Sequence, residues 1–152
     1  MMNSIKNVKE ELCCGCGACY QTCPKQCIHM EQNKRGFLIP VVDENICVNC
    51  GACIKTCPEQ SQPLMKMVKN AYVAIAKNKE ILNMSTSGGI FGILSESVIA
   101  AGGCVYGCMW NQQGYAQQGK IECIQELEKI QKSKYVQSDT KRTFIEVQND
   151  LK

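Results

Sequence analysis

The chain has 152 residues, a formal net charge of +3 and 20% charged residues, a composition typical of a soluble globular protein with one or two small domains. No apolar stretch reaches the roughly 20 residues that cross a bilayer, and no basic stripe with interleaved aromatic residues favours nucleic-acid binding. The N-terminal segment, Met1 to Leu12, alternates Lys and Glu without an apolar core. We therefore expect no secretory signal, no membrane span and a cytoplasmic location.

Cysteine is the most informative residue type, with 13 copies. Such a content favours disulfides in a secreted chain and metal binding in a reducing cytosol. Eight of the cysteines follow the spacing C-x2-C-x2-C-x3-C-P, which occurs twice at an offset of 34 residues. The first run is Cys13, Cys16, Cys19 and Cys23 followed by Pro24, and the second is Cys47, Cys50, Cys53 and Cys57 followed by Pro58.

This doubled run is typical of domains that hold two [4Fe–4S] clusters. Three thiolates on one tight loop hold three irons of a cubane, whereas the fourth cysteine points away and binds the other cluster, because the proline stiffens the turn after it. Gly17 and Gly51 let each loop curl around its cluster. Zinc is the alternative, but a zinc site gives no role to the third cysteine or to the proline. The expected ligands are Cys13, Cys16, Cys19 and Cys57 for cluster one, and Cys47, Cys50, Cys53 and Cys23 for cluster two.

Between the two runs, residues 28–30 and 37–39 flank a polar turn at 32–36. This pattern predicts a β-hairpin in which Gly36 has a positive φ. His29 is expected on the surface of that hairpin. Cys14 and Cys27 fall outside the repeated spacing, and we expect them to be small packing residues and not ligands.

Helical and strand patterns begin after Pro63. We expect a strand at 71–76, a helix at 90–101 and a strand at 104–110, which together suggest a parallel strand–helix–strand unit. A weaker strand near 120–124, a helix at 125–131 and a last helix that begins near Thr140 and still continues at Lys152 follow. The sequence thus predicts an α+β fold, in which a two-cluster bacterial ferredoxin domain at 1–67 is followed by a partial α/β domain at 68–152.

The segment Ser87, Gly88 and Gly89 opens the helix expected at 90–101. Free N–H groups at a helix start attract phosphate, whereas an ordinary N-cap followed by close-packed glycines is the alternative. The last helix stops without a cap, so we expect a truncated protein. Three further cysteines lack a CxxC pair and a histidine partner, and we expect them to be buried thiols: Cys104, Cys108 and Cys123.

Three segments of the second half resemble the beta-subunit family of coenzyme F420 hydrogenase/dehydrogenase. They are STSGGIF at 85–91, GGCVYG at 102–107 and SKYVQS at 133–138. The segment GFLIP at 36–40 is also similar to the linking hairpin of members that begin with a two-cluster ferredoxin domain.

The resemblance implies a flavoprotein that relays electrons between clusters, FAD and an acceptor such as a deazaflavin. It places Ser87, Gly88 and Gly89 at the FAD pocket of the full-length relatives, and it implies a longer protein, so we expect this chain alone to bind FAD weakly or not at all. The expected partner is a redox partner protein or a flavin domain. The alternative is a stand-alone ferredoxin-like electron carrier or docking module without catalytic activity. No residue is identified as catalytic.

Overall fold

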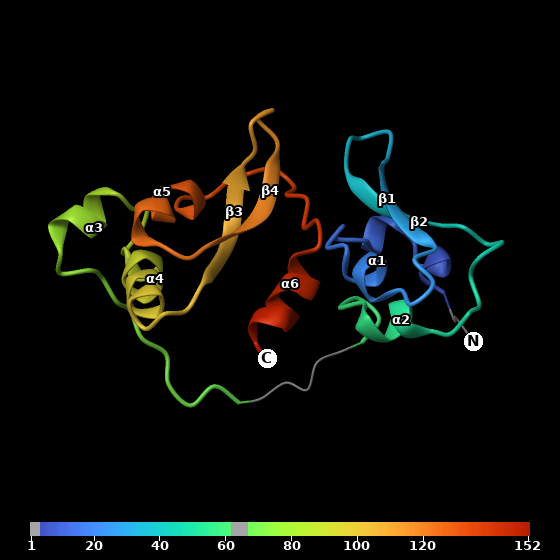
Figure 1. Cartoon of the computed structure of the whole chain (residues 1–152), viewed down its shortest axis with the longest axis horizontal. Coiled ribbons are helices and arrows are strands. Elements are labelled where there is room, and N and C mark those ends of the chain that lie inside the picture. The colour runs from blue at the N-terminus through green and yellow to red at the C-terminus, as the bar shows by residue number, and fades with distance from the viewer. Residues whose placement is uncertain (1–3, 62–66) are drawn as a thin grey trace. The chain divides into compact units, whose positions relative to one another are not determined.

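The computed structural model describes residues 4–61 and 67–152, which form two compact units (Figure 1). Unit 1 combines Met1–Lys66 with Asp139–Lys152, and unit 2 comprises Met67–Ser138. The chain therefore leaves unit 1, builds unit 2 and returns to unit 1. The expected domains 1–67 and 68–152 remain a prediction, and their boundary adjoins residues 62–66, which lie outside the described residues.

Unit 1 consists of short helices around one antiparallel hairpin. The hairpin expected from the turn at 32–36 is confirmed: Ile28 pairs with Val42, and Gly36 has a φ of 81°. Asn33 closes the turn, because its side-chain oxygen accepts hydrogen bonds from the N–H groups of Arg35 and Phe37. The elements are η1 (Ile5–Asn7), η2 (Glu10–Leu12), α1 (Ala18–Thr22), β1 (Ile28–Gln32), β2 (Leu38–Val42), α2 (Ala52–Thr56) and α6 (Thr143–Asp150).

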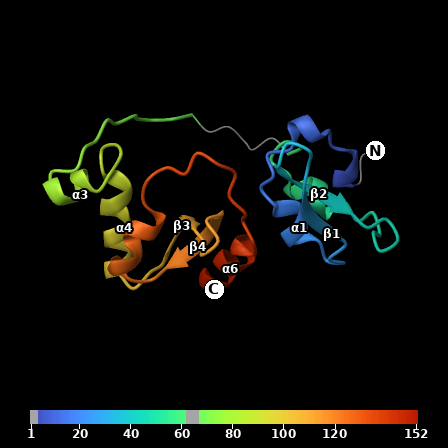
Figure 2. The same ribbon diagram turned by 90° about the horizontal axis from the view of Figure 1, so that it is seen from above.

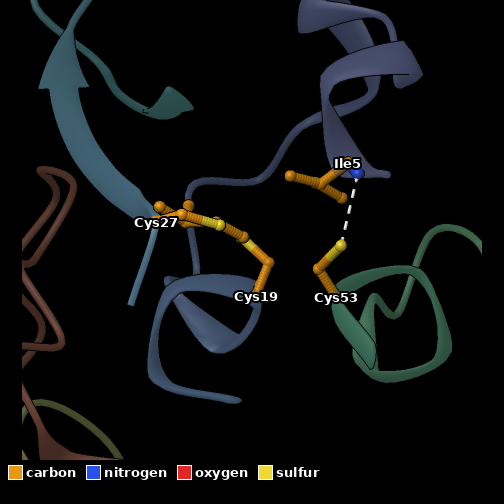
Figure 3. Close-up of a cluster of buried hydrophobic side chains, with 5 residues drawn as sticks. Ile5, Cys19, Cys27 and Cys53 are labelled. Atoms are coloured by element: carbon orange, nitrogen blue, oxygen red, sulfur yellow. Dashed lines mark hydrogen bonds between the residues drawn. The ribbon is translucent and has the colours of Figure 1, made fainter. Parts of the chain in front are cut away.

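The core of unit 1 is built largely from cysteine. Figure 3 shows Ile5, Cys19, Cys27 and Cys53 in one buried cluster, which Ile28 completes. Their side chains are at most 8% exposed. Because thiols are small, this core buries little apolar surface per residue.

Unit 2 contains the second hairpin, β3 (Val105–Trp110) and β4 (Ala116–Ile121), seen from above in Figure 2. Its small core consists of Ile121, Leu127 and Ile130. The helix expected at 90–101 and the strand expected at 104–110 are confirmed as α4 (Ile90–Ala100) and β3. The remaining elements of unit 2 are α3 (Lys79–Asn83), η3 (Ile124–Glu126) and α5 (Leu127–Ile130).

The expected parallel strand–helix–strand unit is wrong. Residues 71–76 form no strand, and Tyr72 and Val73 are almost fully exposed. Instead β3 pairs with β4, antiparallel, across a tight turn in which Asn111 accepts backbone hydrogen bonds as Asn33 does in the first hairpin. A local hairpin costs less chain entropy than a crossover, so it is the pairing that this segment can form by itself.

Other boundaries differ in detail. The weaker strand begins earlier than expected, since β4 spans Ala116–Ile121, and the helix expected at 125–131 is divided into η3 and α5. The last helix starts at Thr143 and ends at Asp150, before Lys152. The described residues combine helices with two small antiparallel sheets, which is a mixed α+β architecture without a parallel pair. Within the same residues, no helix has the length and apolar character that crossing a membrane requires.

Candidate metal centre

The two cysteine runs adopt the same backbone conformation. Gly17 and Gly51 lie in the left-handed region immediately before α1 and α2, and Gly15 and Asn49 lie there two residues earlier. Glycine tolerates this region freely, and asparagine more readily than most other residues. Each helix ends just before the cysteine that precedes the proline, and this cysteine is extended, because proline disfavours a helical conformation of the residue before it. The repeat in sequence is therefore a repeat in structure.

The first cavity brings together four cysteines of the repeat. Cys13, Cys16 and Cys19 come from the first run and Cys57 is the last cysteine of the second. The cavity has a volume of about 200 Å³, and the exposed Cys14 also lines it. Apolar walls come from Ile5, Val8, Met30 and Ile39, and the charged residues Lys6, Glu10 and Glu59 also line the cavity.

The second cavity brings together the other four. Cys47, Cys50 and Cys53 come from the second run and Cys23 is the last cysteine of the first. Its volume is about 20 Å³, a tenth of that of the first cavity. Cys50 is the exposed one of these four cysteines.

The eight cysteines thus divide four and four, with the last cysteine of each run in the cavity of the other run. In residues 4–61 and 67–152, no three cysteine, histidine or acidic side chains meet closely enough to hold a single metal ion. A cubane instead takes one thiolate on each iron, so its ligands surround a cavity. In donor type and number, both sites fit a [4Fe–4S] cluster.

Burial and hydrogen bonding act differently on the thiols. Burial raises the pKa of Cys19 to about 12. Burial also opposes ionisation of Cys23, but hydrogen bonds from the backbone N–H and the thiol of Cys27 outweigh it and lower the pKa of Cys23. Because iron binds the thiolate, cluster binding must displace the proton that burial holds on Cys19.

One polar atom near the second cavity has no partner. Ser4 is 1% exposed and lines this cavity, and its hydroxyl makes no hydrogen bond to any described residue. The next residue also faces this site, since the N–H of Ile5 donates to Sγ of Cys53 at 3.4 Å (Figure 3). A buried hydroxyl without a partner is costly, so it indicates a missing acceptor in the cavity.

The segment Asp139–Lys152 holds the first loop from outside. Thr140 donates its hydroxyl to the carbonyl oxygen of Cys16 at 2.9 Å, and Nε2 of Gln21 donates to Thr140 at 3.3 Å. Oε1 of Gln21 in turn accepts from the N–H of Phe144 at 2.9 Å. A Cβ at Gly17 would lie 2.6 Å from Oγ1 of Thr140, so only glycine permits this approach. We call Thr140, Gln21 and Phe144 the clasp.

The cysteines outside the repeat differ in burial. Cys27 is 4% exposed and packs in the core, as expected of a small packing residue, with its Sγ 3.5 Å from that of Cys23. Cys14 is exposed, so the packing interpretation is wrong for this residue. Cys104 and Cys108 are partly buried, but Cys123 is exposed, contrary to the expected buried thiol. His29 is exposed, as expected, and pairs with Glu31 at 2.7 Å.

Ser87, Gly88 and Gly89 lie at a separate cavity of about 390 Å³ in unit 2, which Lys132 and Ser133 also line. The glycines are needed by the chain itself: a Cβ at Gly88 would lie 2.6 Å from the carbonyl oxygen of Ala74. Close packing therefore explains Gly88 without a ligand. The role of these three residues in cofactor binding stays a prediction.

Residues 12–61 match the family model described as "4Fe-4S dicluster domain". This match covers about a third of the chain and includes all eight cysteines of the repeat. Residues 12–61 are thus a ferredoxin-type iron–sulfur domain. No curated protein matches the chain.

Sequence reasoning missed three features of these sites: Ser4, the clasp and Lys132. Ser4 and Thr140 lie outside the cysteine runs, and no local pattern indicates that they approach them. Lys132 follows α5 and has a φ of 65°. A search of the sequence for a cation to accompany the expected phosphate-binding segment could have suggested it.

Proposed function

We propose that this chain transfers electrons one at a time through two [4Fe–4S] clusters, as part of a flavin oxidoreductase similar to the beta subunits of coenzyme F420 hydrogenase/dehydrogenase. The observation that carries the proposal is the division of the eight cysteines between two cavities, with the last cysteine of each run exchanged. When bound, each cluster accepts and releases single electrons.

The protein residues supply ligands, orientation and shielding. The left-handed residues before α1 and α2 shape the two loops, and the fourth cysteines join one run to the other. Apolar side chains such as Val8 and Ile39 limit the access of water to the first cavity, which tunes its electron affinity. A flavin domain or a redox partner protein would take up the electrons, and a deazaflavin is one acceptor that the resemblance implies.

The decisive experiment combines metal analysis with one pair of variants. Anaerobically purified protein should contain about eight irons per chain and a visible absorbance that dithionite bleaches. Stoichiometric zinc with little iron would overturn the proposal. Cys23→Ser should damage the cluster on Cys47, Cys50 and Cys53, whereas Cys27→Ser, 3.5 Å away in the same cavity, should keep all of the iron. If Cys23→Ser instead lost the cluster on Cys13, Cys16 and Cys19, the proposed exchange of the fourth ligands would be wrong.

The flavin part of the proposal rests on the cavity at Ser87, Gly88 and Gly89. The cavity lies at the start of α4, an eleven-residue helix whose first N–H groups are free to bind phosphate, and Lys132 adds a positive charge to its lining. Tight binding of a cofactor buries most of its surface. A cavity of about 390 Å³ is small for FAD, so we predict weak binding or none by this chain.

Titration of FAD, followed by flavin fluorescence, tests this point. Sub-micromolar binding would contradict weak binding. If any binding is measured, Lys132→Gln should weaken it, whereas Lys129→Gln should not, because Lys129 pairs with Glu126 and does not line the cavity. A chain that carries eight irons and shows no flavin binding in any context would favour the alternative, a stand-alone ferredoxin-like carrier or docking module.

A further inference from the structure

Ser4 is buried beside the second cavity without a hydrogen-bond partner among the described residues. An unsatisfied buried hydroxyl is costly, so native proteins rarely keep one unless a ligand, an ion or an ordered water satisfies it. Ser4 lines the cavity and is 1% exposed to solvent, so the cavity is the place where its hydroxyl can find an acceptor.

The four cysteines around this cavity define the acceptor. Thiolates and inorganic sulfide accept hydrogen bonds, and a cluster with four thiolates is anionic. The neighbouring backbone amide shows that sulfur accepts a hydrogen bond at this site, since the N–H of Ile5 donates to Sγ of Cys53, one of the four cysteines. Ser4 and Ile5 thus present an O–H and an N–H donor to the same sulfur-rich site.

Among the described residues, the first cavity has a different side-chain donor, the ammonium of Lys6, which pairs with Glu44 at 3.1 Å. None of the described residues that line it carries a hydroxyl, and its walls include Val8, Met30 and Ile39. The two sites therefore have the same number and type of cysteine ligands but differ in the hydrogen-bond donors around them.

We propose that Ser4 is a positioning residue that donates a hydrogen bond to the sulfur of cluster two and raises its reduction potential relative to that of cluster one. This inference rests on the proposed function, because it requires a cluster at each site. A donor near the sulfurs stabilises the reduced cluster, which carries one more negative charge, more than the oxidised one.

The test is a redox titration of Ser4→Ala, followed by EPR at each cluster. We expect the potential of cluster two to fall by about 40 mV and that of cluster one to stay unchanged. This shift is a fivefold change in the ratio of reduced to oxidised cluster, at 59 mV per tenfold for one electron. Fivefold corresponds to about 1 kcal/mol, the size of one net hydrogen bond, taken as the difference in strength of the Ser4 hydrogen bond between the reduced and the oxidised cluster. Ser61→Ala is the matched control, because the hydroxyl of Ser61 already donates a hydrogen bond to the carbonyl oxygen of Cys57.

A spectroscopic readout separates this role from simple packing. In wild-type protein, transfer to D₂O should shift the Fe–S stretching frequencies of cluster two, and the part of the shift due to Ser4 should vanish in Ser4→Ala. Eight irons with an unchanged potential and D₂O shift in the variant would overturn this inference alone. Wild-type protein with only four irons, all bound at the first site, would overturn the second cluster itself, and this inference with it.

Discussion

The two cysteine runs have the same spacing and the same left-handed backbone positions, yet their surroundings differ. The first cavity is larger and has no hydroxyl among the described residues that line it, and the clasp holds its loop. The second is tight, has an exposed loop and contains the buried hydroxyl of Ser4. A sequence repeat can therefore fix ligands and loop shape, whereas segments outside the repeat make the two sites different.

The largest difference should appear at the paired glycines before α1 and α2. Alanine in the left-handed region costs roughly 1–2 kcal/mol at either site. At Gly17 the new Cβ would also meet Oγ1 of Thr140 at 2.6 Å, whereas at Gly51 nothing lies within 4 Å. Opening the clasp should add about 1 kcal/mol or more for each lost hydrogen bond. Denaturant unfolding of the iron-loaded variants should thus show Gly17→Ala to be less stable than Gly51→Ala, and equal stabilities would contradict the asymmetry.

Breaking the clasp itself should have the next largest effect. Thr140→Val keeps the shape of the side chain but removes its hydroxyl, so the Cys16 carbonyl and the Gln21 amide each lose a partner. We expect a cost of about 1–2 kcal/mol. Iron release to a chelator should become biphasic, with about half of the iron leaving faster.

Thr140→Ser keeps the hydroxyl and is the control, expected to release iron as the wild type does. Hydrogen exchange should increase at 13–23 and not at 47–57 in Thr140→Val. If the release of iron from both clusters were accelerated equally, Thr140→Val would destabilise the whole unit, and the clasp would not act specifically on the first cysteine loop.

The smallest effects concern the two cysteines outside the repeat, one beside each cavity. Cys27→Ala should keep all of the iron and cost about 1 kcal/mol, because the side chain is 4% exposed in the core. Cys14→Ala should also keep the iron but change stability by less than about 0.5 kcal/mol, because Cys14 is exposed. Iron analysis and thermal unfolding check both, and the loss of four irons from either variant would show that it is a ligand.

The sequence predicted the features that local chemistry determines. The first hairpin followed from Gly36, and the grouping of the eight cysteines agrees with the doubled spacing. The second hairpin uses the same turn, with Asn111 and Gly114 in the places of Asn33 and Gly36, and could have been found from that signal. The parallel pair was predicted because residues 71–76 are rich in β-forming residues. A strand, however, needs a partner strand, and residues 71–76 pair with none of the strands among the described residues.

Long-range contacts account for the rest. Thr140 lies 124 residues from Cys16, and Ser4 precedes the first run by nine residues, so neither contact follows from spacing. Only the folded chain brings them to the cysteine loops. Unit 2 also exposes large apolar side chains, among them Tyr72, Val73 and Leu94, which composition alone did not reveal.

The return of Asp139–Lys152 to unit 1 has a consequence for biosynthesis. Domains generally fold as they leave the ribosome, with N-terminal parts first. Here both cysteine runs emerge early, but the clasp cannot close until residues 140–144 have been synthesised, after the whole of unit 2. Unit 1 thus begins before unit 2 and is completed only after it, so the nascent chain presents its first cysteine loop unclasped while unit 2 is being synthesised.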